Sequence, residues 1–144
     1  MASLLTVRLN GLDALSLGVK YLQQGAQGGL RHGVDEAAGI FEAAAKSNAP
    51  VDTGRLRDSI HTETTLDTPE RQERNVRPDT PYARRIELGF VGPDSLGRMF
   101  HQPAQPYMRP AYDTERDRAA AAIKDNVYAG LDEAMNASSM KARR

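Results

Sequence analysis

One short stretch divides the sequence into two halves with different periodicity. Residues 49–60 read Ala-Pro-Val-Asp-Thr-Gly-Arg-Leu-Arg-Asp-Ser-Ile. Proline disfavours helical geometry at the residue before it, so a helix that reaches this stretch should end at Pro50. The Asp-Thr-Gly triplet offers side-chain hydrogen bonds to the backbone and a permissive φ, as a tight turn requires. We expect a structural turn between a helical half and a sheet half, followed by an extended segment from Arg55. Its residues are Pro50, Asp52, Thr53, Gly54, Arg55 and Leu56.

Before this turn, apolar residues recur with helical spacing. The pattern runs through Leu12, Leu15, Val19 and Leu22, then through Leu30, Val34, Ala37, Ala38, Phe41 and Ala45. This spacing predicts a long amphipathic helix that packs on a sheet. The glycines at 25, 28, 29 and 33 weaken the pattern and favour a kink or break there. Ahead of the helix, apolar residues alternate with polar ones at positions 5–10, which predicts a short strand.

After the turn the pattern becomes β-like. Residues 59–66 are rich in Thr and Ile and predict a strand, and residues 70–77 could pair back as a polar strand. Residues 82–90 are ambiguous between a helical turn and a strand. The Gly- and Pro-rich residues 91–106 predict a long loop, and loops of this length are usually functional or ordered by partners.

A second helix should begin near Pro110, because proline suits the first turn of a helix. Its apolar stripe is Ala119, Ile123, Val127, Leu131 and Met135. We therefore predict an α+β fold, in which a small antiparallel sheet is packed by a long N-terminal helix and a C-terminal helix. Residues 1–136 should form a single domain, and residues 137–144 a polar, basic tail.

Composition excludes several classes of protein. The 144 residues carry 19 basic and 19 acidic side chains, and this zero net charge argues against a strongly basic nucleic-acid module. There is no cysteine, so disulfides and thiolate metal sites are excluded. No apolar run of membrane-spanning length and no signal-peptide pattern is present, so we expect synthesis in the cytoplasm and no membrane partner.

Asp52-Thr53-Gly54 has the sequence of an aspartic-protease triplet. That mechanism needs two carboxylates that share a proton, set on apolar strands. Here the triplet follows Pro50 at a predicted helix end, and Arg55 comes directly after it, so a dimeric protease is a remote alternative. The three histidines have no metal-binding spacing, and no phosphate-binding loop or nucleophile elbow occurs. We expect no enzyme activity and no catalytic, cofactor-binding or metal-binding residue.

A DNA-binding or packaging accessory protein is a second alternative. Arginines that could contact a phosphate backbone cluster between residues 71 and 85, but acidic residues are interleaved with them. Such mixing is typical of a solvated face or a charge-paired subunit interface. The residues concerned are Arg71, Arg74, Arg77, Arg84 and Arg85.

Three motifs in this order resemble one phage family. They are residues 49–60, then Tyr82-Ala83 with Ile86-Glu87-Leu88-Gly89, then residues 105–111, which read Gln-Pro-Tyr-Met-Arg-Pro-Ala. The chain resembles, over nearly its full length, the gene-product-ten-like neck and tail-component proteins of long-tailed phages. These proteins are also described as head–tail connector or tail-completion proteins.

The resemblance implies a non-enzymatic virion protein that forms part of a ring at the head–tail junction. Such rings are usually six- or twelve-fold, and their neighbours would be the connector, tail terminator or tail tube rings. DNA would pass through the lumen without sequence-specific binding. The resemblance assigns interface or packing roles to Tyr82, Glu87, Gly89, Arg109 and Pro110. The loop at 91–106 and the polar strands between 62 and 77 are the expected contacts with other subunits.

Overall fold

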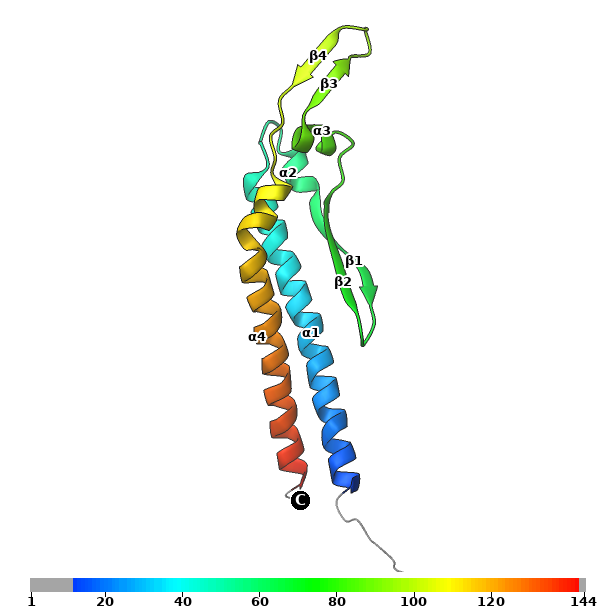
Figure 1. The fold of residues 1–144 in the computed structure, drawn as a ribbon, viewed down its shortest axis with the longest axis vertical. Helices are drawn as coiled ribbons and strands as arrows, with labels where there is room; N and C mark the ends of the chain where they lie inside the picture. Colours follow the sequence, from blue (N-terminus) through cyan, green and yellow to red (C-terminus); the bar gives the residue numbers. More distant parts are fainter. Residues whose placement is uncertain (1–11, 143–144) are drawn as a thin grey trace, which may run out of the picture.

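The computed structural model describes residues 12–142, which fold into two long helices and two β-hairpins. Figure 1 shows the helices side by side along the length of the molecule, with both hairpins attached towards one end. The elements are α1 (Leu12–Asn48), α2 (Arg55–Ser59), β1 (Ile60–Asp67), β2 (Gln72–Pro78), α3 (Ala83–Leu88), β3 (Phe90–Pro93), β4 (Met99–Gln102) and α4 (Met108–Ala142). The predicted α+β class is confirmed. The predicted strand at residues 5–10 lies outside the described residues.

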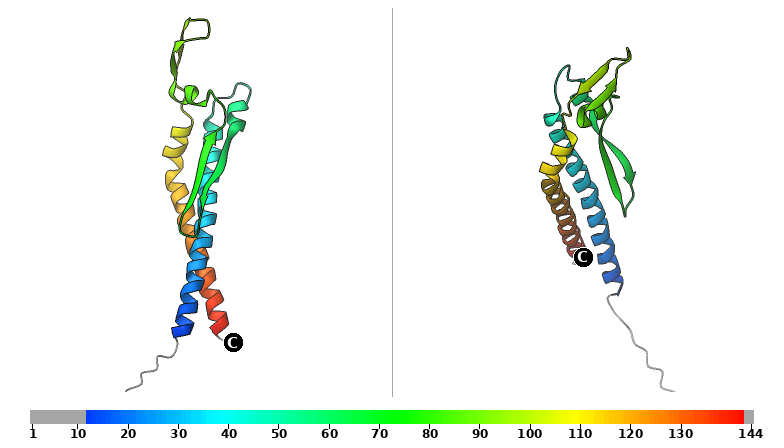
Figure 2. Two further views of the ribbon diagram at one scale, coloured as in Figure 1. Left: turned by 90° about the vertical axis from the view of Figure 1, so that its right-hand side faces the viewer. Right: turned by 45° about the horizontal axis from the view of Figure 1, so that its top comes forward.

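Helix α1 runs without a break through all four glycines, so the predicted break is wrong. Its principal partner is α4, which lies antiparallel to it, rather than a sheet (Figure 2). Three of these glycines, at positions 25, 29 and 33, explain both results. A Cβ added at Gly29 would lie 2.8 Å from the Cα of Val127, and one at Gly33 would lie 2.7 Å from the Cα of Ile123. These glycines therefore let the two helix backbones approach closely, and the packing offsets their low helix propensity.

Helix α1 ends at Asn48, ahead of Pro50 as predicted, but Arg55 does not begin an extended segment. Residues 55–59 form the short helix α2 instead, in which the Asp58 N–H donates to the Gly54 carbonyl over 2.9 Å. None of Arg55, Leu56 and Arg57 is β-branched, so nothing in this stretch opposes one helical turn.

The first hairpin has the predicted strands. β1 and β2 pair antiparallel from Ile60 opposite Pro78 to Asp67 opposite Gln72, with a register shift between Thr64 and Leu66. The hairpin lies along α1, and side-chain contacts connect the two. Arg74 donates to Asp35 over 2.5 Å, and Arg31 donates to Asp67 over 2.6 Å.

The region predicted as a loop, residues 91–106, contains the second hairpin. β3 and β4 pair antiparallel and form a sheet of their own, separate from β1 and β2. The ambiguous residues before it form the helix α3. At the other end of the chain, α4 continues to Ala142, through residues predicted as a tail. Within residues 12–142 no helix is both long and apolar enough to cross a membrane.

Candidate functional site

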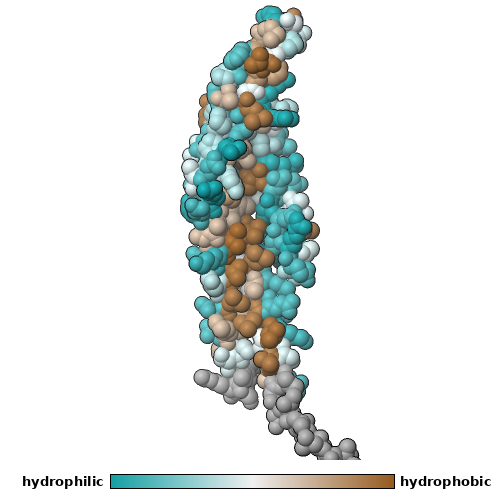
Figure 3. All heavy atoms as spheres, in the orientation of Figure 1, coloured by the Kyte–Doolittle hydropathy of each residue, from teal (hydrophilic) through white to brown (hydrophobic). Residues whose placement is uncertain are grey.

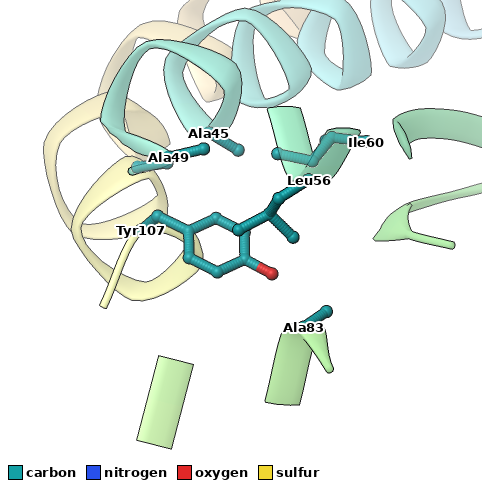
Figure 4. Close-up of a cluster of buried hydrophobic side chains, with 7 residues drawn as sticks. Ala45, Ala49, Leu56, Ile60, Ala83 and Tyr107 are labelled. Atoms are coloured by element: carbon teal, nitrogen blue, oxygen red, sulfur yellow. The ribbon is translucent and has the colours of Figure 1, made fainter. Parts of the chain in front are cut away.

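Beneath the turn that follows α1, buried side chains from both helices and from the first hairpin meet in one cluster. Figure 4 shows Tyr107 among alanines of α1 and the side chains of Leu56, Ile60 and Ala83. Tyr107 is fully buried, and most of its neighbours are small, so its ring fills the space that they leave. The cluster consists of Ala45, Ala49, Leu56, Ile60, Ala83, Tyr107 and Ala111.

The turn itself depends on its glycine. Gly54 is buried with φ +79°, a conformation that residues with a Cβ rarely adopt. The Thr53 hydroxyl accepts a long hydrogen bond of 3.5 Å from the Arg55 N–H. Leu56 is buried in the cluster, whereas Asp52 is exposed and makes no hydrogen bond within residues 12–142. The backbone of Gly54 and the burial of Leu56 therefore hold this turn.

Glu87, on α3, caps the N-terminus of α4. One carboxylate oxygen accepts from the N–H groups of Tyr107 (2.8 Å) and Met108 (3.0 Å), and the other accepts from the N–H of Arg109 (3.0 Å). These donors lack partners within their own helix, and the helix dipole favours a negative charge there. Burial raises the pKa of Glu87, but the three N–H donors outweigh it and hold the pKa below its usual 4.5.

The base of the second hairpin is closed beside this cap. The Gln105 N–H donates to the Ile86 carbonyl over 2.7 Å. Gly89 leaves α3 with φ +76°, and a Cβ there would lie 2.9 Å from the Ala104 nitrogen. Both ends of the segment between α3 and α4 are thus fixed to the body of the protein.

Beyond this base, the hairpin β3–β4 projects from the body and exposes apolar side chains. Figure 1 shows it extending past the end of the two helices, and Figure 3 shows hydrophobic residues on this end of the surface. Leu96 and Met99 are each 74% exposed. Monomeric proteins rarely expose apolar side chains in groups, and such groups mark interaction sites. The exposed apolar residues at and next to the hairpin are Leu88, Val91, Leu96, Met99 and Phe100.

Hydrogen bonds hold the turn at the tip of the hairpin. Asp94 accepts hydrogen bonds from the N–H groups of Leu96 (2.8 Å) and Arg98 (2.9 Å) and from the Arg98 side chain (2.8 Å). The backbone and side chain of Arg98 hold the pKa of Asp94 below its usual value. At the root of the hairpin, Arg85 lies over the ring of Phe90, 4.4 Å from its centroid. The apolar side chains are therefore carried by a hairpin with internal contacts at both its tip and its root.

The first hairpin presents a different surface. Arg77 pairs with Glu63, Arg71 pairs with Glu73, and the half-buried Arg74 pairs with Asp35 of α1. With Arg85 over Phe90, only Arg84 of the five arginines considered for DNA contact lacks a described partner in residues 12–142. The structure thus brings together no free basic surface from this set.

The remaining candidate residues are spread over the same end of the molecule. Tyr82 packs against the buried cluster, and Pro110 lies in the first turn of α4. Arg109 is exposed and lies 3.6 Å from the carboxylate of Asp113. Asp52 precedes a short helix rather than an apolar strand, so the setting that an aspartic protease requires is missing here. Residues 12–142 contain no cluster of potential metal ligands.

Two features of this site were not predicted from the sequence. Tyr107 belongs to a recognised motif, but nothing in its spacing shows that it is the largest buried side chain. The cue for the hairpin is Asp94 with Gly97 three residues later, which is the signature of a turn. Gly92 and Pro93 beside it obscure the alternation expected of strands.

Comparison with known families finds one match. The model described as "Bacteriophage HK97-gp10, putative tail-component" matches residues 17–89. The match covers most of α1, the turn, the first hairpin and α3, and it ends at the glycine that opens the segment carrying β3 and β4. The comparisons with curated proteins and with solved structures gave no match.

Proposed function

The chain belongs to the HK97-gp10-like family of bacteriophage tail components, and we propose that it is a subunit of a ring at the head–tail junction of a long-tailed phage. In this role it is a non-enzymatic structural protein of the neck, which completes the tail or connects it to the head. The family match supports the broader role of a tail component of the virion.

The observation that carries the proposal is the projecting hairpin β3–β4. It exposes apolar side chains, contacts mainly itself, and is fixed at its base by Glu87 and Gln105. An arm whose base and turn are already hydrogen-bonded loses less conformational freedom when it binds, so less of the contact energy is spent on ordering it. We infer that the hairpin reaches an adjacent subunit.

An arm that contacts a different surface of the next copy makes a heterologous interface. Repetition of such an interface gives a closed ring when the rotation closes. We propose a six- or twelve-fold ring around a lumen through which DNA passes without sequence-specific binding. Its neighbours would be the adjacent connector, tail terminator or tail tube rings.

The residues of the site support a structural role. Glu87, Tyr107 and Gly54 are all engaged in capping, packing or turn formation. The paired arginines of the first hairpin weaken the DNA-binding alternative. A DNA affinity that falls steeply with salt concentration would support that alternative.

The protease alternative predicts that Asp52→Asn abolishes cleavage of a peptide substrate.

The decisive experiment is a cryo-electron-microscopy map of the intact phage particle. We expect density for this chain as a closed ring between portal and tail tube. Its presence elsewhere in the tail would reject the neck position but keep the family role, and its absence from the particle would reject a virion role.

A second experiment tests the hairpin. We expect the triple variant Leu96→Ser, Met99→Ser and Phe100→Ser to fold normally but to be missing from particles made by a phage that depends on it. Val51→Ser is the matched control, because Val51 is also an exposed apolar residue but lies outside the hairpin. Normal incorporation of the triple variant would show that the hairpin is not the contact.

A further inference from the structure

One side of the α1–α4 pair exposes a row of apolar side chains. In α1, Gly18 and Gly29 face α4, and in α4, Val127 and Ala134 face α1. The residue that directly follows each of these positions lies about 100° further round its helix. Because the helices are antiparallel, these following residues lie on the same side of the contact in both helices. With the residues one turn before Val19 and Met135, they form what we call the apolar face: Leu15, Val19, Leu30, Tyr128, Leu131 and Met135.

The rest of the described chain leaves much of this face open to solvent. Val19 is 55% exposed and Met135 is 49% exposed. The first hairpin ends before it reaches the face, because its tip is bonded to Arg31 through Asp67, and the α1 residues of the face precede Arg31. Figure 3 shows hydrophobic residues in a band along the lower half of the helix pair. A group of exposed apolar side chains marks an interaction site.

The opposite side of the same contact is mainly polar. Gln24, His32 and Glu133 directly precede residues that face the other helix, and all three are exposed. Leu17 is an exposed apolar residue on that side. The contrast between the two sides indicates that the apolar face serves to be covered.

The segment that precedes α1 has the composition and the reach to cover this face. Leu5, Val7 and Leu9 alternate with polar residues, and Asn10-Gly11 is a dipeptide that favours a chain reversal. Residues 1–9 span about 30 Å when extended. Leu30 lies about 27 Å along α1 from Leu12, so a segment that reverses at Asn10-Gly11 can reach the far end of the face.

The spacings of the segment and the face also agree. Alternate residues of a strand repeat every 6.6 to 6.8 Å or about that, and one helical turn rises about 5.4 Å, so successive apolar residues of the segment meet successive turns. Val7 is three residues from Asn10, which is about 10 Å in a strand. Val19 lies about 10 Å along α1 from Leu12, so the two valines come to the same height.

We propose that residues 4–9 fold back at Asn10-Gly11 and bind the apolar face of their own chain. The same segment of a second copy could make the same contacts, but the chain's own segment is tethered next to the face. Tethering gives it an effective concentration of about millimolar, so it should occupy the face first. This inference does not depend on the proposed function.

Crosslinking of the isolated full-length protein tests the position of the segment. The sequence contains no cysteine, so introduced cysteines have no competitors. Under mild oxidation, Val7→Cys combined with Val19→Cys should form a disulfide within one chain, as seen on a non-reducing gel and by mass spectrometry. Val7→Cys combined with Leu17→Cys is the matched control, because Leu17 lies on the opposite side, and its yield should be about tenfold lower. Equal yields for the two pairs, or a disulfide that joins two chains, would overturn the proposal.

Thermal melts test whether the contact stabilises the chain. Leu5→Ser with Val7→Ser should lower the melting temperature by about 5 °C, because the apolar side chains that cover the face are lost. Thr6→Ser with Arg8→Gln is the control on the other side of the segment and should leave the melting temperature unchanged. When Val19→Ser and Met135→Ser are already present, Leu5→Ser with Val7→Ser should have little further effect. An unchanged melting temperature, or an equal further loss in that background, would contradict binding to this face.

Discussion

The helix pair α1–α4 and the hairpin β3–β4 are both antiparallel, but the helix contact is built from small residues and the hairpin carries larger ones. The helices face each other through glycines and alanines, so that backbone lies against backbone. The hairpin contacts mainly itself and leaves larger apolar side chains exposed. The comparison teaches that close packing is concentrated at the helix contact, whereas the hairpin, like the outer faces of the helices, presents apolar side chains to solvent.

The difference has an energetic reason. Close contact between helices depends on the absence of side-chain atoms, so any added atom forces the backbones apart. Replacing an exposed apolar side chain removes few contacts within the folded chain, because most of its surface faces water. Substitutions should therefore affect stability strongly in the first region and weakly in the second.

The largest effect is expected at the helix contact. In Gly25→Ala the new Cβ would lie 2.7 Å from the Cβ of Ala134 and would also meet the carbonyl of Gly130. We expect a loss of about 3 kcal/mol in the free energy of unfolding, measured by urea denaturation. The control is Gly28→Ala in the same helix, where nothing lies within 4 Å of the new atom. It should gain about 0.5–1 kcal/mol from helix propensity. Equal stability of the two variants would mean that the helices are not in close contact at Gly25.

The next effect concerns the cap that joins the two regions. Glu87→Ala leaves three N–H groups of α4 without their acceptor and should lose about 2–3 kcal/mol. Glu87→Gln keeps one acceptor oxygen and should lose about half as much. Glu133→Gln, on the exposed face of α4, should leave the stability unchanged.

The Glu87 cap also predicts a pH dependence. The folded-state pKa lies below 4.5, so the stabilisation is present above this value and is lost as the pH falls through the folded-state pKa. The difference in unfolding free energy between wild type and Glu87→Gln should therefore shrink in acid. A difference that stays constant from neutral pH to pH about 3 would contradict this account of the cap.

A smaller effect is expected at the turn. Gly54 has φ +79°, and Gly54→Val should lose about 1–2 kcal/mol because a β-branched residue avoids this conformation. Gly54→Asn should lose less, since asparagine tolerates it better. Thermal melts of the two variants test the order. A valine variant as stable as wild type would show that the turn adopts another backbone conformation.

The smallest effect on stability is expected in the hairpin. Leu96→Ser or Met99→Ser should change the free energy of unfolding by less than about 0.5 kcal/mol, because both side chains are exposed. Urea denaturation of the single variants gives the comparison with Gly25→Ala. A loss above about 2 kcal/mol would mean that the hairpin packs on its own chain.

The local parts of the fold could be predicted from the sequence. Pro50 marked the end of α1, the Thr-rich residues after it marked β1, and Pro110 marked the first turn of α4. Each of these signals acts within a few residues of the structure that it determines. For this reason the α+β class and the first hairpin could be predicted.

The contacts between distant residues could not be predicted in the same way. The helix propensity of a glycine is low whether or not another helix packs against it. Here the backbone of α4 at Ile123 and Val127 packs against the glycines of α1, and the sequence near those glycines does not show this. Glu87 and Tyr107 are twenty residues apart, so no local pattern joins the cap to its helix. The strands β3 and β4 have only four residues each, too few to show a periodicity.

The closed base of the β3–β4 segment also bears on how such a chain can evolve. Glu87 and the Gln105 N–H hold α3 against the start of α4, so what lies between residues 90 and 104 does not set the geometry of the body. The entropic cost of a longer segment grows only slowly with its length. The family match also ends at Gly89, where this segment begins. We infer that this segment could change in length or sequence without moving the two long helices.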